Sequence, residues 1–460
     1  MRRVSQRAWA LVALIAVLLG GLGFFLGEFM INANAWVSHT NSPHLFGNSG
    51  ASAGTVVDRN GSMLLTIGGD SAYAESKNVR KAMLHWLGDR EGKINAPLIA
   101  GYADEMSRYN LVNGLYSYSD EPGVIELTLS ADIQAAALKA MGSQQGVVAV
   151  YNYQTGEVLC AVTTPTYDPN DPPQLTAEEL ENDPAYDGLY WNRVTRSTYT
   201  PGSIFKIATT AAALETIRDI QEQTFECTGR VEYGPDAVTC ENAHGTVDLK
   251  TAMRKSCNCA YAQIADQLGA ATLTRYMDKF GIASSLEFDG ITTRAGSFDI
   301  AGAADVQVAW AAIGQHTDQV NPMQYMSFMG AIAGGGSGAE PYLVRSVTSG
   351  EDVVYEARAS KTGRLVSADA AQILTEYMHN NVENNYGSYN FPGLTVCAKS
   401  GTSQVGGDQA SNALFSGFVA DAEYPLAFIV VVENGGYGSS ACVPVLSKVL
   451  AACKAEIDSQ

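Results

Sequence analysis

Residues 199–206 read YTPGSIFK, and the chemistry that the chain can carry out centres on this stretch. Its Pro-Gly pair predicts a turn, and the apolar run 207–214 predicts a buried helix behind that turn. Ser203 and Lys206 lie three residues apart at the helix start, on one face, so the amine can take the hydroxyl proton. The helix N-terminus adds backbone N–H groups near the hydroxyl. S-x-x-K occurs nowhere else in the chain, and we predict a Ser203 nucleophile with Lys206 as its base.

A second pair of polar residues, Ser256 and Asn258, follows the helical pattern of residues 249–255. The same S-x-N spacing also occurs at 76–78 and 388–390, so the tripeptide alone decides nothing. Ser256 lies between two amphipathic stretches, where a short turn can project a hydroxyl and an amide into a cleft. We therefore select Ser256 and Asn258 as catalytic residues.

A second lysine motif can bind a substrate carboxylate, and the chain offers two candidates. Residues 361–363 read KTG but lie in a polar loop before a helix that Ser367 is expected to cap. The other motif ends the predicted strand 394–398 and is followed by a second strand, 413–419. Because a strand edge holds a charge and hydroxyls rigidly, we predict that the substrate is bound by Lys399, Ser400, Gly401 and Thr402.

Composition excludes several classes of function. The 460 residues are 46% hydrophobic and 17% charged, a balance that supports a large folded core. Acidic residues outnumber basic ones 48 to 29, so the net charge of −19 makes nucleic acid an unsuitable partner. None of the 6 histidines has a paired spacing, and the 8 cysteines form no pair of C-x-x-C motifs. We therefore predict no metal and no cofactor.

The N-terminus predicts a membrane anchor. Residues 8–27 carry no charge, and Glu28 closes the run. Its length suits one bilayer crossing, and the arginines at positions 2, 3 and 7 favour a cytoplasmic N-terminus. A cleaved signal peptide is the alternative, because Ala-Asn-Ala at 33–35 has the small-x-small pattern of a processing site. An uncleaved anchor is favoured, since the apolar run exceeds a usual signal core of roughly 7–15 residues.

Beyond the anchor, four segments follow from changes in composition. We predict a cytoplasmic tail and transmembrane anchor at 1–27, a linker at 28–53, a small α+β domain at 54–123 and a catalytic domain at 124–460. The expected elements are a hairpin of strands 55–57 and 63–67, helices 79–87 and 95–108, a strand 124–129, a helix 131–141 capped by Ser130, and a hairpin of strands 146–151 and 157–163.

The cysteines allow two interpretations outside the cytoplasm. Cys227 and Cys240, separated by a Gly-Pro turn, form the best candidate disulfide, while two reduced thiols remain almost equally acceptable. Cys257 and Cys259 are too close in sequence to bridge comfortably and are predicted to be packing residues.

The ordered set S-x-x-K, S-x-N and K-S-G resembles the penicillin-binding transpeptidases. The similarity to the monofunctional class B branch extends over nearly the whole chain, through further motifs at 56–61, 151–157, 167–170, 192–193, 243–245, 312–315 and 432–436. It implies an α+β fold of the serine penicillin-recognising type, in which an antiparallel sheet flanked by helices meets an all-helical lobe. A small N-terminal α+β pedestal and one transmembrane helix complete the expected architecture. His316 departs from the pattern, because glycine is more usual there.

The resemblance implies a peptidoglycan D,D-transpeptidase, a cell-wall enzyme of cell division and cell shape that β-lactams acylate. Ser203 would attack the bond between the terminal D-alanines of a stem peptide, with Lys206 as base, Ser256 as proton relay and Asn258 as substrate amide contact. Lys399, Ser400 and Thr402 would bind the terminal carboxylate, and the N–H groups of Ser203 and Thr402 would form the oxyanion hole. By analogy, a SEDS-type membrane glycosyltransferase would be a partner.

Two alternatives belong to other functional classes. A membrane-anchored serine β-lactamase needs a carboxylate that activates water, and Glu376 in the pattern E-x-x-x-N is the candidate. Its helix, with apolar Ile373, Leu374 and Tyr377, is expected to turn Glu376 toward solvent instead. A β-lactam sensor would need further transmembrane segments, and an inert scaffold would be expected to have lost a catalytic group.

Overall fold

A five-stranded antiparallel sheet lies at the centre of the molecule, in the order β17-β18-β19-β7-β8. The computed structural model describes residues 2–37, 54–67, 72–102, 108–110, 115–117, 123–404 and 410–460. The predicted hairpin around Gly156 is confirmed, because β7 pairs with β8 antiparallel. The bounds are β7 Gly146–Asn152, β8 Val158–Thr164, β17 Val396–Ser403, β18 Asn412–Val419 and β19 Leu426–Val432.

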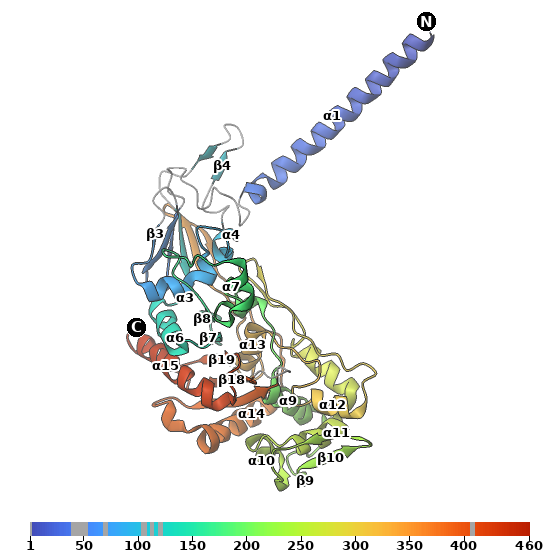
Figure 1. Ribbon diagram of the computed structural model, residues 1–460, viewed down its shortest axis with the longest axis vertical. Coiled ribbons are helices and arrows are strands. Elements are labelled where there is room, and N and C mark those ends of the chain that lie inside the picture. The colour runs from blue at the N-terminus through green and yellow to red at the C-terminus, as the bar shows by residue number, and fades with distance from the viewer. Residues whose placement is uncertain are drawn as a thin grey trace.

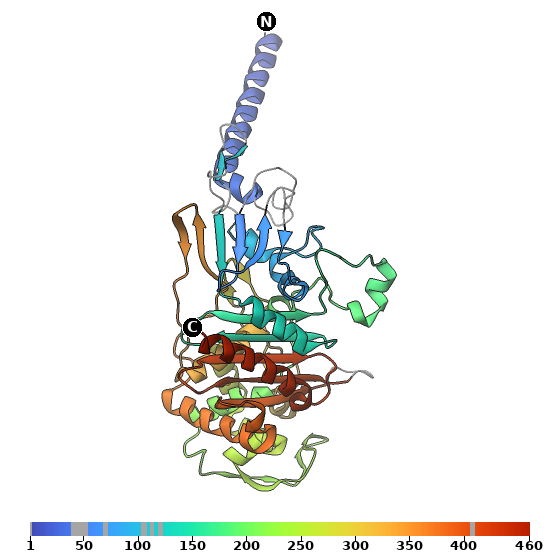
Figure 2. The same cartoon turned by 90° about the vertical axis from the view of Figure 1, so that its left-hand side faces the viewer.

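Helices cover both faces of this sheet, which explains why its strands are nearly continuous apolar runs. One face packs against α6 (Ala131–Met141) and the C-terminal α15 (Gly438–Asp458), which lie side by side in Figures 1 and 2. The other face packs against α13 (Pro322–Ala333), where Gly330 lets Tyr151 approach closely. Ser130 caps α6 as predicted, since its hydroxyl accepts a hydrogen bond from the Ile133 N–H.

A mostly helical lobe lies beyond β17, at the end of the molecule opposite the N-terminal helix (Figure 1). Its helices include α9 (Lys206–Thr216), α10 (Leu249–Arg254), α11 (Asn258–Lys279), α12 (Asp305–Ala311) and α14 (Ala368–Asn381), the last capped by Ser367 as predicted. Short hairpins fill the outer side, with bounds β9 Thr224–Cys227, β10 Arg230–Tyr233, β11 Asp236–Thr239 and β12 Gly245–Asp248. The lobe and the sheet edge thus face each other.

A second sheet of six strands, in the order β16-β15-β6-β1-β2-β3, forms the pedestal. The predicted Asn-Gly hairpin is confirmed, because β1 (Gly54–Val57) and β2 (Met63–Ile67) pair antiparallel. The strands β3 (Ala72–Tyr73), β6 (Gly123–Leu127), β15 (Val344–Ser349) and β16 (Asp352–Glu356) complete the sheet. The last two strands come from far along the chain, so the boundary at residue 123 separates segments that share one sheet. The division into domains remains a prediction.

One predicted helix of the pedestal is wrong. The helix expected at 95–108 is a single turn, α4 (Pro97–Ala100), and Arg108 belongs to the short strand β4 (Arg108–Asn110), which pairs with β5 (Leu115–Ser117). A proline at the first position starts the turn, and Gly101 ends it. Helix α3 (Lys77–Leu87) agrees with the prediction and packs against α6.

Partly buried ion pairs join the two sheets. Arg345 of β15 lies 2.7 Å from both Glu126 and Glu157, and Arg59 lies 3.5 Å from Glu157 and 3.4 Å from Glu456 of α15. These five side chains come from five separate segments of the chain, so each charge has a partner only in the assembled fold. The network fixes the pedestal against the catalytic sheet.

The N-terminal helix α1 (Arg2–Val37) stands apart from the rest of the molecule in Figure 1. Residues 5–31 of this helix are long and apolar enough to cross a membrane, and no part of that span is buried in the structure. The helix is longer than the predicted anchor, since it includes residues 28–37 of the expected linker. The rest of that linker, 38–53, lies outside the described residues.

Candidate active site

Ser203 lies in a 3₁₀ turn (Gly202–Phe205) that leads directly into α9, so Lys206 is the first residue of the helix behind it. Lys206 is completely buried, and its Nζ lies 2.9 Å from the Oγ of Ser203. Burial, followed by the positive charge of Lys399, holds the pKa of Lys206 well below its usual value. The predicted nucleophile and base are therefore in contact, and both effects shift the amine toward its neutral form.

Ser256 and Asn258 are brought to the same amine by the turn between α10 and α11. The Nζ of Lys206 donates hydrogen bonds to the backbone oxygen of Ser256 (2.9 Å) and to the Oδ1 of Asn258 (2.7 Å), and it lies 3.0 Å from the Ser256 Oγ. Ser256 adopts a left-handed backbone with φ of 51°, which a non-glycine residue rarely does. This backbone directs the Ser256 hydroxyl, the Ser256 carbonyl group and the Asn258 side chain toward the Lys206 amine.

These contacts determine which way the Lys206 lone pair points. A neutral amine has two N–H donors and one lone pair, and a carbonyl oxygen can only accept. The oxygens of Ser256 and Asn258 occupy both donors. The lone pair is then left for a hydroxyl proton from Ser203 or Ser256, which is the arrangement that a general base requires.

Lys399 approaches from the opposite side, on β17 at the edge of the sheet. Its side chain is 1% exposed, burial lowers its pKa to about 7, and its Nζ donates to the backbone oxygen of Ser400 at 2.8 Å. Ser400 and Thr402 are half-buried and alternate along the strand with buried Lys399 and Gly401. One strand therefore supplies a cation from one face and two hydroxyls from the other.

Three glycines let the backbones around Ser203 approach closely. A Cβ on Gly202 would lie 2.6 Å from the Thr402 carbonyl oxygen, and one on Gly401 would lie 2.6 Å from that of Pro201. A Cβ on Gly314 would lie 2.2 Å from the Gly202 oxygen. Only glycine fits at these contacts, which hold the nucleophile turn against β17. The eight residues selected from the sequence thus lie on two facing surfaces.

A comparison with known families identifies this arrangement. Residues 146–451 match the family described as the penicillin binding protein transpeptidase domain. The chain belongs to this family. It is also 30% identical over 348 residues to the peptidoglycan D,D-transpeptidase PbpA of Mycolicibacterium smegmatis, covering 69% of each chain. The predicted membership of the class B penicillin-binding proteins is confirmed.

Solved structures of penicillin-binding proteins share the fold. Penicillin-binding protein A from M. tuberculosis, in a ceftriaxone acyl-enzyme complex, has a TM-score of 0.74 at 23% identity over 88% of this chain and 99% of its own. A D,D-transpeptidase domain from Eggerthella lenta has a TM-score of 0.75 at 23% identity over 89% and 99%. A complex between penicillin-binding protein PBP2 and MreC from Helicobacter pylori has a TM-score of 0.61 at 22% identity over 71% and 63%. The expected α+β fold is therefore confirmed.

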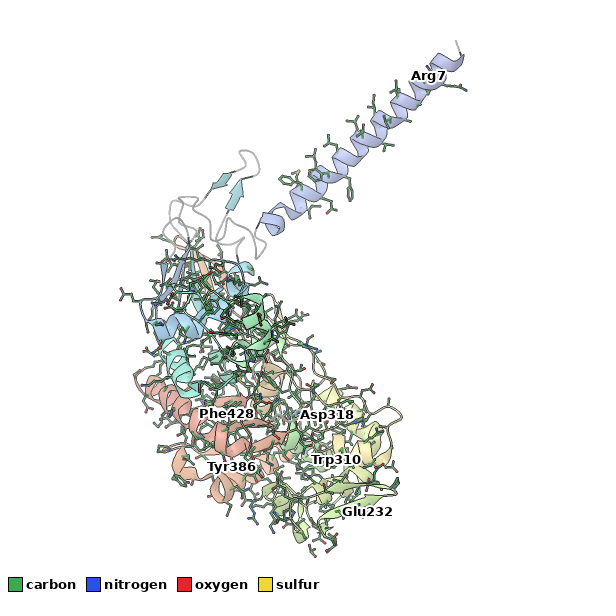
Figure 3. The ribbon with its side chains drawn as sticks, in the orientation of Figure 1. Arg7, Glu232, Trp310, Asp318, Tyr386 and Phe428 are labelled. Carbon is green, nitrogen blue, oxygen red and sulfur yellow. The ribbon has the colours of Figure 1, made fainter. Side chains whose placement is uncertain are left out.

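Tyr386 contacts the third motif, and the sequence did not reveal this contact. Its hydroxyl accepts a hydrogen bond from the Ser400 N–H at 3.0 Å and lies 3.0 Å from the Ser400 Oγ. The ring stands edge-on against Phe415, which stacks on Phe428; Figure 3 shows Tyr386 and Phe428 in this part of the molecule. Tyr386 thus fixes the edge strand that carries the third motif. Its position after the helix of Ser367 gave no signal for this contact.

A second unpredicted group lies behind the nucleophile turn. Glu433 accepts two hydrogen bonds from Arg193, at 2.8 and 3.0 Å, and one from the Tyr199 hydroxyl at 2.8 Å. Arg193 is almost fully buried, so this bidentate pair is strongly held. Residues 192–193 and 432–436 were two of the motifs behind the family resemblance, and the pair explains why they occur together.

The competing motifs lie elsewhere. Glu376 is 64% exposed and forms an ion pair at 2.6 Å with Lys250, so its predicted solvent-facing position is confirmed. Lys361 is exposed in a loop, Ser76 begins α3, and Ser388 lies in a 3₁₀ turn (Ser388–Asn390). Glu376 is thus paired with Lys250 at the surface, rather than placed to activate the water that a β-lactamase needs for deacylation.

The candidate disulfide is absent, since Cys227 and Cys240 are both free in the described structure. The Sγ of Cys240 lies instead 3.8 Å from that of Cys257, and the Sγ of Cys227 lies 3.5 Å from the Nδ1 of His244. Cys259 is fully buried, as predicted for a packing residue. The sequence separation of 13 residues did not predict which sulfurs meet, because Cys227 ends one short strand, Cys240 follows another, and the two strands belong to different hairpins.

Proposed function

We propose that the chain is a peptidoglycan D,D-transpeptidase in which Ser203 forms the acyl-enzyme. The observation that carries this assignment is the Lys206 amine, whose two N–H groups are occupied by carbonyl oxygens while two serine hydroxyls lie within 3.0 Å. Family membership supplies the substrate class, a stem peptide that ends in two D-alanines.

Acylation begins when the Ser203 Oγ attacks the carbonyl carbon between these alanines and its proton passes to the Lys206 Nζ. The N–H groups of Ser203 and Thr402 would stabilise the oxyanion, and the close approach of Gly202 to Thr402 supports this pairing. The C–N bond then breaks, and the Ser256 hydroxyl delivers a proton to the leaving amine while Lys206 returns its own proton to Ser256. Free D-alanine leaves, and the peptide remains as an ester on Ser203.

Substrate binding falls to the two facing surfaces. The Lys399 charge and the hydroxyls of Ser400 and Thr402 would hold the terminal carboxylate, whose negative charge favours the protonated lysine. The Asn258 amide would contact the peptide backbone. The amine of a second stem peptide then attacks the ester, restores the Ser203 hydroxyl and forms the cross-link. A β-lactam would follow the first step and stop as a stable ester.

The remaining assignments concern the rest of the chain. We infer that the arginines before the apolar helix keep the N-terminus in the cytoplasm and place residues 54–460 outside. Residues 54–123 would serve as a pedestal for the transpeptidase domain 124–460. The edge strand β16 exposes Val353 and Val354, which supports a protein contact on this sheet. We propose a SEDS-type membrane glycosyltransferase as the partner.

The test is a cross-linking assay with the full chain in detergent, using a synthetic stem pentapeptide as donor and an amine-bearing stem peptide as acceptor. The expected result is a cross-linked dimer of the two stem peptides with release of one D-alanine per bond, absent in Ser203→Ala. The matched control is Ser197→Ala, in the same segment. D-alanine release by both variants at the native rate would contradict the assignment of Ser203.

A further inference from the structure

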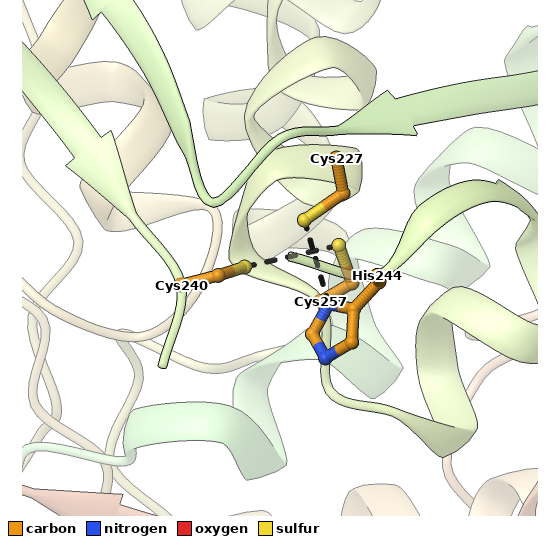
Figure 4. Close-up of side chains that lie close together, drawn as sticks. All are labelled: Cys227, Cys240, His244 and Cys257. Atoms are coloured by element: carbon orange, nitrogen blue, oxygen red, sulfur yellow. Dashed lines mark hydrogen bonds between the residues drawn. The ribbon is translucent and has the colours of Figure 1, made fainter. Parts of the chain in front are cut away.

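Four potential metal ligands converge in the helical lobe, next to the second catalytic motif. Cys227 ends β9, Cys240 follows β11, His244 precedes β12, and Cys257 lies in the turn before α11. Their three Sγ atoms and one histidine nitrogen all lie within 4.8 Å of one another. Figure 4 shows the four side chains pointing toward a common centre from separate segments.

The distances within this cluster are those of a tetrahedral site. Two thiolates at about 2.3 Å from one zinc ion are about 3.8 Å apart, and a thiolate and an imidazole nitrogen are about 3.6 Å apart. The observed separations are 3.8 Å between Cys240 and Cys257 and 3.5 Å between Cys227 Sγ and His244 Nδ1. A disulfide would require a separation of about 2.05 Å.

Backbone N–H groups point at two of the sulfur atoms. The Cys259 N–H donates to the Cys240 Sγ at 3.3 Å, and the Ala260 N–H donates to the Cys257 Sγ at 3.4 Å. Cys227 and Cys257 are buried, whereas Cys240 and His244 are half-buried, so the site is closed on the inside and reachable from outside.

We propose that Cys227, Cys240, His244 and Cys257 bind one zinc ion as a structural Cys₃His site. Binding forms three Zn–S bonds and one Zn–N bond to the Nδ1 of His244. Each thiol that is still protonated releases its proton to solvent. No oxidation state changes. The sequence criteria missed the site because its ligands are separated by 12, 3 and 12 residues rather than by the two residues of a C-x-x-C motif.

The ion would act on the catalytic site by holding the Ser256–Asn258 turn. Cys257 is the middle residue of this turn, and the strained φ of Ser256 needs an external constraint. On the other side, the Asn258 Nδ2 donates to the backbone oxygen of Thr239 at 2.8 Å, and Thr239 directly precedes Cys240. Asn258 thus directly follows one proposed ligand, Cys257, and its side chain contacts the residue that precedes another, Cys240. The four ligands are positioning residues rather than catalytic ones.

The first test measures metal content without reference to activity. Cells are grown with zinc in the medium, and the full chain is purified in detergent. It should contain one zinc ion per chain by inductively coupled plasma mass spectrometry. His244→Ala should weaken zinc binding at least about tenfold. Cys453→Ala, which removes a buried cysteine far from the cluster, should retain one zinc. In the native chain, replacement by Co²⁺ should give thiolate-to-metal charge-transfer absorption.

The second test asks whether the ion positions the turn. Removal of zinc with a chelator should slow acylation by a fluorescent penicillin about tenfold, and added Zn²⁺ should restore it. Absence of zinc and of the cobalt absorption from the native chain would overturn the proposal, and so would a Cys240–Cys257 disulfide in a non-reduced peptide map. Zinc content, cobalt absorption and the peptide map do not depend on Ser203, so the zinc proposal can fail separately from the assignment of the nucleophile.

Discussion

Tyr386→Phe tests how the third motif is positioned. The substitution removes only one hydroxyl, but that oxygen holds both the N–H and the Oγ of Ser400 at 3.0 Å. Because β17 is an edge strand, the half-buried Ser400 N–H would then lack its partner. An unmet buried group costs about 1–3 kcal/mol, and a loss of about 1.4 kcal/mol from the acylation transition state corresponds to about tenfold in rate.

We therefore expect Tyr386→Phe to lower the free energy of unfolding by about 1–3 kcal/mol and to slow penicillin acylation about tenfold. Stopped-flow labelling and denaturant unfolding would measure the two effects. Tyr389→Phe is the matched control, because Tyr389 lies three residues away and is 84% exposed. Native stability and native acylation in Tyr386→Phe would refute the role of this hydroxyl.

Three further predictions concern charged residues. Lys399→Ala should slow penicillin acylation at least about tenfold by removing a buried carboxylate contact, whereas Lys361→Ala should change the acylation rate by no more than about twofold. The reverse order of labelling rates would assign the third motif to residues 361–363. Glu376→Gln should leave the decay of the penicillin adduct unchanged in intact-mass measurements, and a strong slowing would instead make Glu376 a deacylating base. Asp318 is buried, its oxygens have no hydrogen-bond partner in the described structure, and burial raises its pKa well above the usual value. The native chain should therefore lose stability as pH rises above about 4. Asp318→Asn should remove this loss and raise the free energy of unfolding at pH 7 by about 1–3 kcal/mol. An equal increase at pH 4 would contradict the explanation.

Local signals in the sequence predicted the elements that carry the site. The S-x-x-K turn, the cap at Ser130 and the choice of residues 399–402 over 361–363 each rest on a few neighbouring residues, and the structure places all of them as expected. The positive φ of 69° at His316 also explains why glycine is more usual there.

Contacts between distant segments could not be predicted in this way. β15 and β16 join the pedestal sheet from more than 200 residues beyond β6. Tyr386 and Glu433 acquire their partners only through tertiary packing, and the same holds for the four ligands of the proposed zinc site. Burial of a hydroxyl or a thiol against a particular partner depends on the whole fold rather than on local pattern.

The central claim is that Ser203 is the residue that becomes acylated. The most direct measurement is tandem mass spectrometry of the native chain after reaction with penicillin and digestion with trypsin. Cleavage after Arg196 and Lys206 isolates Ser203 in one short peptide together with Ser197. The account predicts one penicilloyl group per chain, carried by this peptide and located by fragmentation at Ser203. An adduct located at Ser197, at Ser256 or on any other peptide would contradict it.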